Sequence, residues 1–259
     1  MFNQTNFLNN LNYENSILLS SRFITKINTI NQYKKVSKLA IFFKNTVNLF
    51  KIILKIFSGF FLSSFSNNHI LKKQYLNKDN LVISHFDNQT NADYIFGNLF
   101  NDKFKNDSHS IFITNLDTKY KKTKLSKHIF KINLFYQIKI ILNLYSISLK
   151  VLIDKSFQTI FEDSHQFKYL SMSYLEYDTF CNLLIFEYLK KNIELHNFKN
   201  IITTFEGHPW EILIFLYSHK KKIKSHAYLH TFLKRHSPYF FFIIKIFSKY
   251  NLHCRKRNE

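Results

Sequence analysis

KNIITTFEGHPWEILIFLYSHKKKIKSHAYLHTF, residues 199–232, predicts a strand, a helix and a second strand in close succession. The apolar run before Glu206 is typical of a buried strand, and residues 207–221 are typical of a helix. The run that begins at Ile223 predicts the second strand. A helical crossover between two strands of one sheet makes them parallel and right-handed. We therefore expect an α/β fold, with a Rossmann-like parallel sheet flanked by helices.

The chain outside this stretch continues the same alternation. Residues 80–88 and 108–117 are short apolar runs that end in polar residues, as buried strands that open into loops do. Helical patterns are expected at residues 34–65, 122–153 and 174–192. The chain has only three glycines and two prolines, so we expect Asn, Asp and Ser to form most of its turns.

These patterns divide the chain into three regions. We expect a helical, basic region at residues 1–75, a Rossmann-like α/β domain at 76–232 and a basic aromatic tail at 233–259. The tail is too short for a second α/β domain, which needs roughly 100 further residues.

The charge of the chain points to anionic partners. Lys and Arg number 37 against 17 Asp and Glu, a net charge of +20. Nucleic acid, an anionic membrane face or phosphorylated substrates all fit such a charge. An alternative is codon bias, because AT-rich codons encode Lys, Asn, Ile, Phe and Tyr. No zinc-finger, RRM or helix-turn-helix signature is present, which makes nucleic acid the least favoured partner.

The sequence predicts a cytoplasmic protein. Two cysteines far apart indicate neither a disulfide framework nor a zinc site, and the first residues lack the pattern of a secretory signal. Lysines interrupt the apolar stretches 47–65 and 132–153, so neither is typical of a membrane span. Residues 36–57 fit a basic helix lying on a membrane surface, or a core-facing helix with lysines toward solvent.

Polar residues follow the predicted strands at the edge where parallel sheets bind ligands. Glu206 and His230 each follow an apolar run of the same βαβ unit, so we expect both at one rim. Gly207 permits the turn from strand to helix, Pro209 fits the first helical turn, and Glu211 complements the helix dipole. Glu206 has no comparable structural explanation, and is either a solvated loop residue or a functional acid.

Further candidates surround these two. His208 is either exposed or part of the site, and Trp210 is either a core residue or a platform on which a sugar or base stacks. A second polar cluster follows the strand predicted near residue 80, where acceptor-binding residues are expected; it consists of Ser84, His85 and Asp87.

Two blocks of the sequence resemble a known family. TTFEGHPWE, followed after fifteen further residues by AYLHT, resembles the EG-x-x-W/Y-E and Y-x-H pattern of bacterial surface-polysaccharide (surface carbohydrate biosynthesis) glycosyltransferase-like proteins. LVISHFDNQTNADYIFGNLF resembles an upstream block of the same family. The matching residues are Ser84, His85, Asp93, Tyr94, Gly97, Glu206, Gly207, Trp210, Glu211, Tyr228 and His230. Leu229 departs from the pattern, where a polar residue is expected.

The resemblance implies a GT-B architecture, of which this chain is the N-terminal, acceptor-side half. The donor-binding domain is expected beyond the end of this chain, so we expect a truncated or split enzyme, and whether it is active alone is open. Glu206 or His230 is the expected catalytic base. The expected substrate-binding residues are Ser84, His85, Asp87, Gly207, His208, Trp210 and Tyr228.

The expected partners follow from the same resemblance. They are a nucleotide sugar as donor substrate, a glycan or lipid-linked acceptor, a separate donor-binding domain and an anionic membrane surface, with neither cofactor nor metal. We expect the protein in the cytoplasm, peripheral on the inner face of the cytoplasmic membrane. The alternative is a non-catalytic α/β protein that binds a membrane or a partner.

Overall fold

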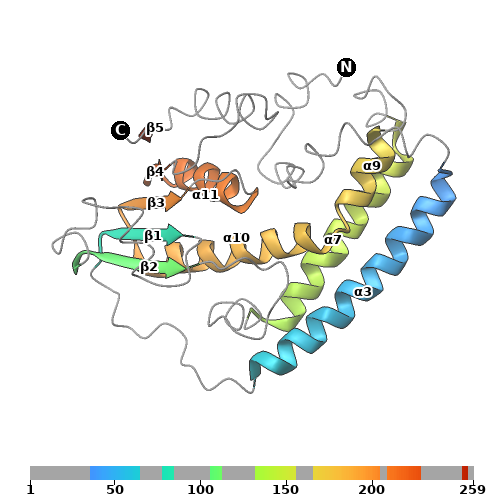
Figure 1. The fold of residues 1–259 in the computed structure, drawn as a ribbon, viewed down its shortest axis with the longest axis horizontal. Coiled ribbons are helices and arrows are strands. Elements are labelled where there is room, and N and C mark those ends of the chain that lie inside the picture. Colours follow the sequence, from blue (N-terminus) through green and yellow to red (C-terminus); the bar gives the residue numbers. More distant parts are fainter. Residues whose placement is uncertain are drawn as a thin grey trace. The chain divides into compact units, whose positions relative to one another are not determined.

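The computed structural model describes residues 36–64, 78–84, 106–112, 132–155, 166–204, 209–228 and 253–255. The described residues fall into two compact units. A helical unit contains residues 36–64 and 132–184, and a sheet unit contains the others (Figure 1).

The helical unit is built from α3 (Lys38–Ser64), α7 (Leu134–Ile153), α9 (Gln166–Ser173) and the first half of α10 (Tyr177–His196). Helix α3 packs against α7, and both contact α9. Helix α7 begins after Asn133, whose side chain accepts a hydrogen bond from the backbone N–H of Phe135 at 2.9 Å. Aliphatic side chains such as Ile41, Ile52 and Ile141 fill the core.

A buried polar cluster joins the three helices. Asn45 of α3 donates hydrogen bonds from Nδ2 to Ser148 Oγ of α7 at 2.8 Å and to Ser171 Oγ of α9 at 3.0 Å. Each serine hydroxyl also donates to the backbone carbonyl of the other serine, at 2.9 Å. Small serine side chains let α7 and α9 approach closely, and the hydrogen bonds offset the cost of burying polar groups.

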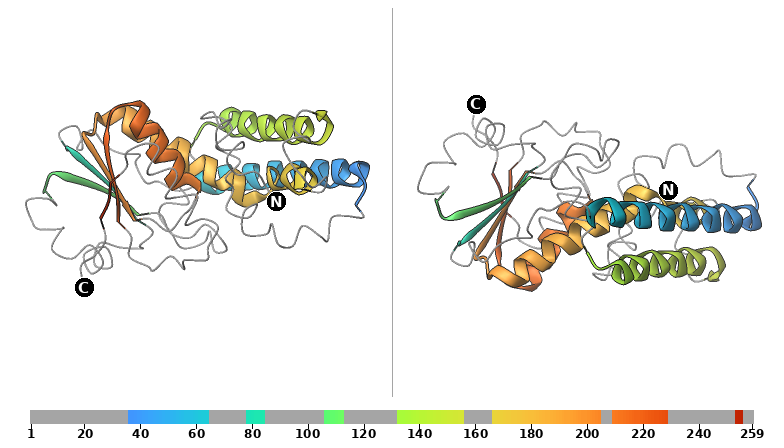
Figure 2. Two further views of the ribbon diagram at one scale, coloured as in Figure 1. Left: turned by 90° about the horizontal axis from the view of Figure 1, so that it is seen from above. Right: turned by 90° about the horizontal axis from the view of Figure 1, so that it is seen from below.

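The sheet unit contains five parallel strands in the part of the chain that the structure describes. They are β1 (Asn80–Ser84), β2 (Ser108–Phe112), β3 (Asn200–Thr204), β4 (Lys224–Tyr228) and β5 (His253–Arg255), in the order β2-β1-β3-β4-β5. Successive strands are rotated relative to one another, as the twist of a parallel sheet requires (Figure 2). The expected α/β fold with a Rossmann-like parallel sheet is confirmed.

The βαβ unit at residues 199–228 has the predicted structure. Helix α11 (Pro209–Lys220) connects β3 to β4, which pair in parallel with Thr204 opposite Tyr228. The helix is almost entirely buried, which explains its nearly continuous apolar sequence.

The compact units do not follow the linear regions expected from the sequence. Helices α7 and α9 lie within the expected 76–232 domain, but they join α3 in the helical unit. Strand β5 comes from the expected tail, residues 233–259, and pairs with β4. Neither association is visible in local patterns, because both join residues that lie far apart in the chain.

Candidate functional site

The strand order places a topological switch point between β1 and β3. From β1 the chain passes to β2 on one side and later to β3 on the other, so the connections diverge at this pair. Ligands of open parallel sheets bind outside the carboxyl ends of the strands at such a point. The carboxyl ends here are Ser84 and Thr204, the positions from which the two predicted polar clusters follow.

The register of β3 and β4 bears on where the two predicted catalytic residues, Glu206 and His230, leave the sheet. Thr204 and Tyr228 are partners across these parallel strands. Glu206 and His230 each come two residues after this pair in the sequence. The paired strands thus agree with the arrangement that the prediction required. Glu206 and His230 themselves lie outside the described residues, as do His85, Asp87, Gly207 and His208.

Three predicted site residues are described. Ser84 is the last residue of β1, and Tyr228, the last residue of β4, is buried. Trp210 lies in the first turn of α11 with only 1% of its surface exposed, in agreement with the core alternative. A substrate contact through the Trp210 ring stays a prediction.

The carboxyl end of β3 carries a feature that the sequence pattern did not single out. Thr203 and Thr204 are fully buried, and the Thr203 hydroxyl donates a hydrogen bond to the Thr204 carbonyl at 2.9 Å. No partner for the buried Thr204 hydroxyl occurs in the structure as described. A buried hydroxyl without a partner costs free energy, which a ligand or a water at this edge would recover. In the sequence, this feature corresponds to two threonines at the end of an aliphatic strand.

Helix α11 begins close after this strand end in the sequence. Its first turn contains Pro209, which fits the position because its missing N–H would have no helical partner there. Glu211 in the same turn is fully buried, where the positive end of the helix dipole favours a carboxylate.

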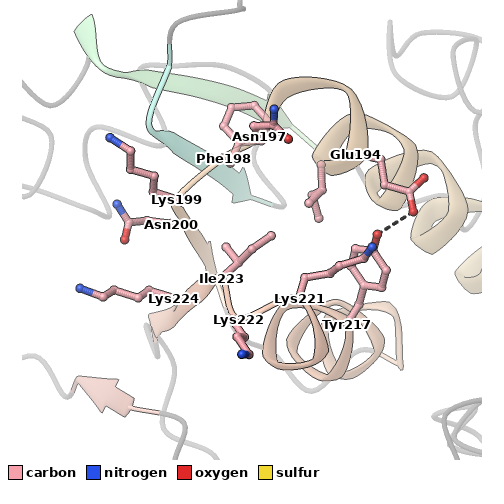
Figure 3. Close-up of a pocket in the computed structure, with 11 residues that line it drawn as sticks. Glu194, Asn197, Phe198, Lys199, Asn200, Tyr217, Lys221, Lys222, Ile223 and Lys224 are labelled. Atoms are coloured by element: carbon pink, nitrogen blue, oxygen red, sulfur yellow. Dashed lines mark hydrogen bonds between the residues drawn. The ribbon is translucent and has the colours of Figure 1, made fainter.

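A cavity of about 660 Å³ lies at the opposite edge of the sheet (Figure 3). It is lined by the starts of β3 and β4 and by the ends of α10 and α11, including Lys199, Lys221, Lys222 and Lys224. Figure 3 shows Lys199 and Lys224 extending away from Lys221 and Tyr217, and Lys199 pairs with Asp79 at 2.9 Å. Since the ammonium groups do not converge, this cavity is not assigned a ligand.

One strong hydrogen bond borders this cavity. The Tyr217 hydroxyl donates to Glu194 Oε1 at 2.6 Å. Burial of the hydroxyl, with the hydrogen bond and the charge of Glu194, raises the pKa of Tyr217 well above its usual range. Tyr217 therefore stays protonated at physiological pH and holds the ends of α10 and α11 together.

Two features of the described residues concern metal ions and membrane spans. No group of three His, Cys, Asp or Glu side chains able to hold a metal ion occurs among them. Of the described helices, α7 alone is long and apolar enough to cross a membrane by length and composition, although it includes Lys139 and Lys150. About a third of that apolar stretch is buried within the protein, and α7 packs on α3 and α9.

Comparisons with protein-family models, with characterised proteins and with solved structures give no match to this chain. The resemblance to glycosyltransferase-like proteins therefore depends on the two sequence blocks alone.

Proposed function

We propose that the chain is a glycosyltransferase-like protein of surface-polysaccharide biosynthesis that binds its acceptor at the carboxyl edge of β1, β3 and β4. The observation that carries the proposal is the switch point between β1 and β3, with the family-like blocks following the strand ends. The buried Thr204 hydroxyl adds support, since a polar group at this strand end has no hydrogen-bond partner in the structure as described.

The proposed chemistry is transfer of a sugar from a nucleotide donor to an acceptor hydroxyl. Glu206 or His230 takes the proton of that hydroxyl, and the acceptor oxygen forms a bond to the anomeric carbon. The bond between this carbon and the donor phosphate breaks, and the nucleotide leaves with the electron pair. A donor-binding domain of GT-B type would hold the nucleotide and is the proposed partner, with a glycan or lipid-linked sugar as acceptor at the cytoplasmic face of the membrane.

Transfer of a labelled sugar to membrane extract, from a panel of nucleotide sugars, tests this function. Glu206→Gln and His230→Ala are compared with Glu187→Gln and His219→Ala, which replace the same residue types on α10 and α11. Loss of a general base lowers kcat by roughly 10²–10⁴-fold, so we expect such a loss in one of the first pair. Undiminished transfer in both Glu206→Gln and His230→Ala would contradict the assigned site.

The alternative is a non-catalytic α/β protein that attaches to a membrane or partner. The exposed apolar side of α3 fits a protein that attaches to a membrane or a partner. Saturable binding of acceptor glycan without transfer from any donor, even when a donor-binding domain is supplied separately, would favour this alternative over the enzyme.

A further inference from the structure

Helix α3 has two apolar sides. Its buried side, which includes Ile41, Asn45, Ile52 and Ile56, belongs to the core of the helical unit. Along its other side runs an apolar stripe that is exposed to solvent and consists of Phe43, Val47, Phe50, Leu54, Phe57 and Phe61.

The stripe is regular and strongly exposed. Its residues are spaced alternately by four and three positions, which places them on one side of a helix. The exposed fractions are 59% for Phe43, 61% for Phe50 and 68% for Leu54. From Phe43 to Phe61 the stripe extends about 27 Å at 1.5 Å per residue. Single exposed apolar residues are normal on proteins, but a continuous row of this length marks an interaction surface.

The charges beside the stripe identify its partner. Lys44 and Lys51 each follow a stripe phenylalanine by one residue, so both lie along the same flank, and both are exposed. Lys55 lies near this flank, with Nζ 3.8 Å from the centre of the Tyr177 ring. The sequence of α3 contains no acidic residue. A helix with an aromatic apolar side and lysines beside it suits the interface of an anionic lipid bilayer.

A second copy of the chain fits this surface less well. If two stripes formed a coiled-coil seam, Lys44 and Lys51 would flank it on both helices, with no acidic side chain on α3 to pair with them. The net charge of +20 adds to the repulsion between two copies and to the attraction toward anionic lipid.

We propose that α3 is the membrane-contact surface of this protein, lying flat on an anionic bilayer with the stripe in the apolar boundary and Lys44 and Lys51 at the headgroups. The buried side of α3 remains on α7 and α9, so the helical unit stays folded while bound. This attachment is independent of sugar transfer, because it uses residues that the proposed site does not contain.

Flotation with phosphatidylcholine vesicles, with and without phosphatidylserine, tests the surface. We expect the full chain to float with the anionic vesicles, to remain in solution with neutral ones, and to dissociate as salt is raised. Equal binding to both vesicles, or binding to neither, would overturn the proposal. No sugar donor is present, so failure here is distinguishable from failure of the proposed transferase function.

Two pairs of variants separate the contributions of charge and apolar contact. Lys44→Ala with Lys51→Ala should lower the partition coefficient roughly 30-fold, at about five- to sixfold per lysine near the surface. Lys191→Ala with Lys224→Ala removes the same charge from α10 and β4, and should change partitioning less than about threefold. A loss as large in this control pair would show that net charge, and not α3, binds the vesicle.

The contribution of apolar contact is tested at exposed residues, so that the variants still fold. Phe50→Gln with Leu54→Gln should lower partitioning roughly 100-fold or more, given the transfer free energy of two such side chains. Leu142→Gln with Ile153→Gln, on the exposed side of α7, should have little effect, with circular dichroism confirming the fold of each variant. An equal loss in the α7 pair would overturn the assignment to α3. If the full chain is a dimer, and Phe50→Gln with Leu54→Gln makes it monomeric without changing its vesicle binding, the partner of the stripe is a second copy of the chain and not a membrane.

Discussion

Tyr217 shows how one side chain can couple the stability of the sheet unit to pH. Its hydroxyl is held by Glu194 at 2.6 Å, from a neighbouring helix, in a buried position. The pKa of Tyr217 is raised in the folded protein, whereas an unfolded tyrosine titrates near its ordinary value of about 10. Above pH 10 only the unfolded state loses this proton, so stability present below pH 10 is lost as pH rises toward the folded pKa.

We therefore expect Tyr217→Phe to have opposite effects at neutral and alkaline pH. At pH 7 the variant should be less stable by about 0.5–1.5 kcal/mol, because it lacks the hydrogen bond. Above pH 10 the stability of the variant should fall less steeply than that of the unchanged protein. The two slopes should differ by up to about 1.4 kcal/mol per pH unit, because the variant lacks one titrating group. Urea unfolding at a series of pH values measures both effects. Parallel curves for the two proteins would contradict the raised pKa.

At the scale of secondary-structure elements, a glycine-poor chain must end its helices with other residues. Asn197, just after α10, has a φ of 49°, and Lys222, just after α11, has a φ of 58°. At the second end the N–H of Ile223 bonds to the Ser218 carbonyl and that of Lys222 to the His219 carbonyl, the pattern of a Schellman motif. Asparagine tolerates this conformation well, as the expected use of Asn in turns implies, but lysine does so at a cost.

Lys222→Gly should accordingly stabilise the protein. Glycine adopts a positive φ without the steric penalty of a Cβ, which is worth about 1 kcal/mol here after its larger unfolded-state entropy is taken into account. Lys221→Gly is the matched control, since it makes the same replacement at the preceding residue, whose φ is not positive. The midpoints of urea unfolding should rise for the first variant and not for the second. A lower midpoint for Lys222→Gly would contradict the positive φ.

At the scale of the whole molecule, the helical unit is assembled from two separate parts of the chain. Residues 36–64 supply α3, and residues 132–184 supply the helices that cover its buried side. A cut at residue 75, which the linear pattern would favour, therefore divides one hydrophobic core. Ile141 and Val151 of α7 belong to that core.

A chain of residues 76–259 should consequently fail to fold cooperatively. Removal of α3 uncovers the apolar side of α7, so we expect aggregation or strong binding of a hydrophobic dye. Adding back residues 36–75 as a separate polypeptide should restore a cooperative melt, because the missing element is needed for packing and not for connectivity. A shortened chain that melts as sharply as the full protein would show that the linear boundary is a true domain boundary.

Local elements were largely predictable, whereas their association was not. The βαβ unit at residues 199–228 has the predicted strands and helix, and α3 and α10 lie close to the expected helical stretches. Periodicity and turn residues act within a few positions, so they are readable from the chain. Helix α9 was not predicted, and its short, weakly amphipathic sequence explains why.

For the candidate site, the sequence predicts a ligand edge from the polar residues that follow apolar strands. The parallel pairing of β3 with β4 meets a requirement of that prediction, and the site itself stays a prediction. Two threonines at the end of an aliphatic strand mark the position of Thr204 in the sequence, but the burial of its hydroxyl cannot be read from them, because burial depends on which elements cover the strand end. The exposed stripe on α3 was equally ambiguous, since its sequence fits a core-facing helix as well as a surface one.

The sequence by itself determined the α/β class, the βαβ unit around Trp210 and the positions of the polar clusters, because these depend on local patterning. Only the tertiary structure decided that β1 lies between β2 and β3, and that α7 and α9 belong with α3. These are contacts between distant parts of the chain. They are selected by which buried surfaces fit together, and no local pattern encodes that fit.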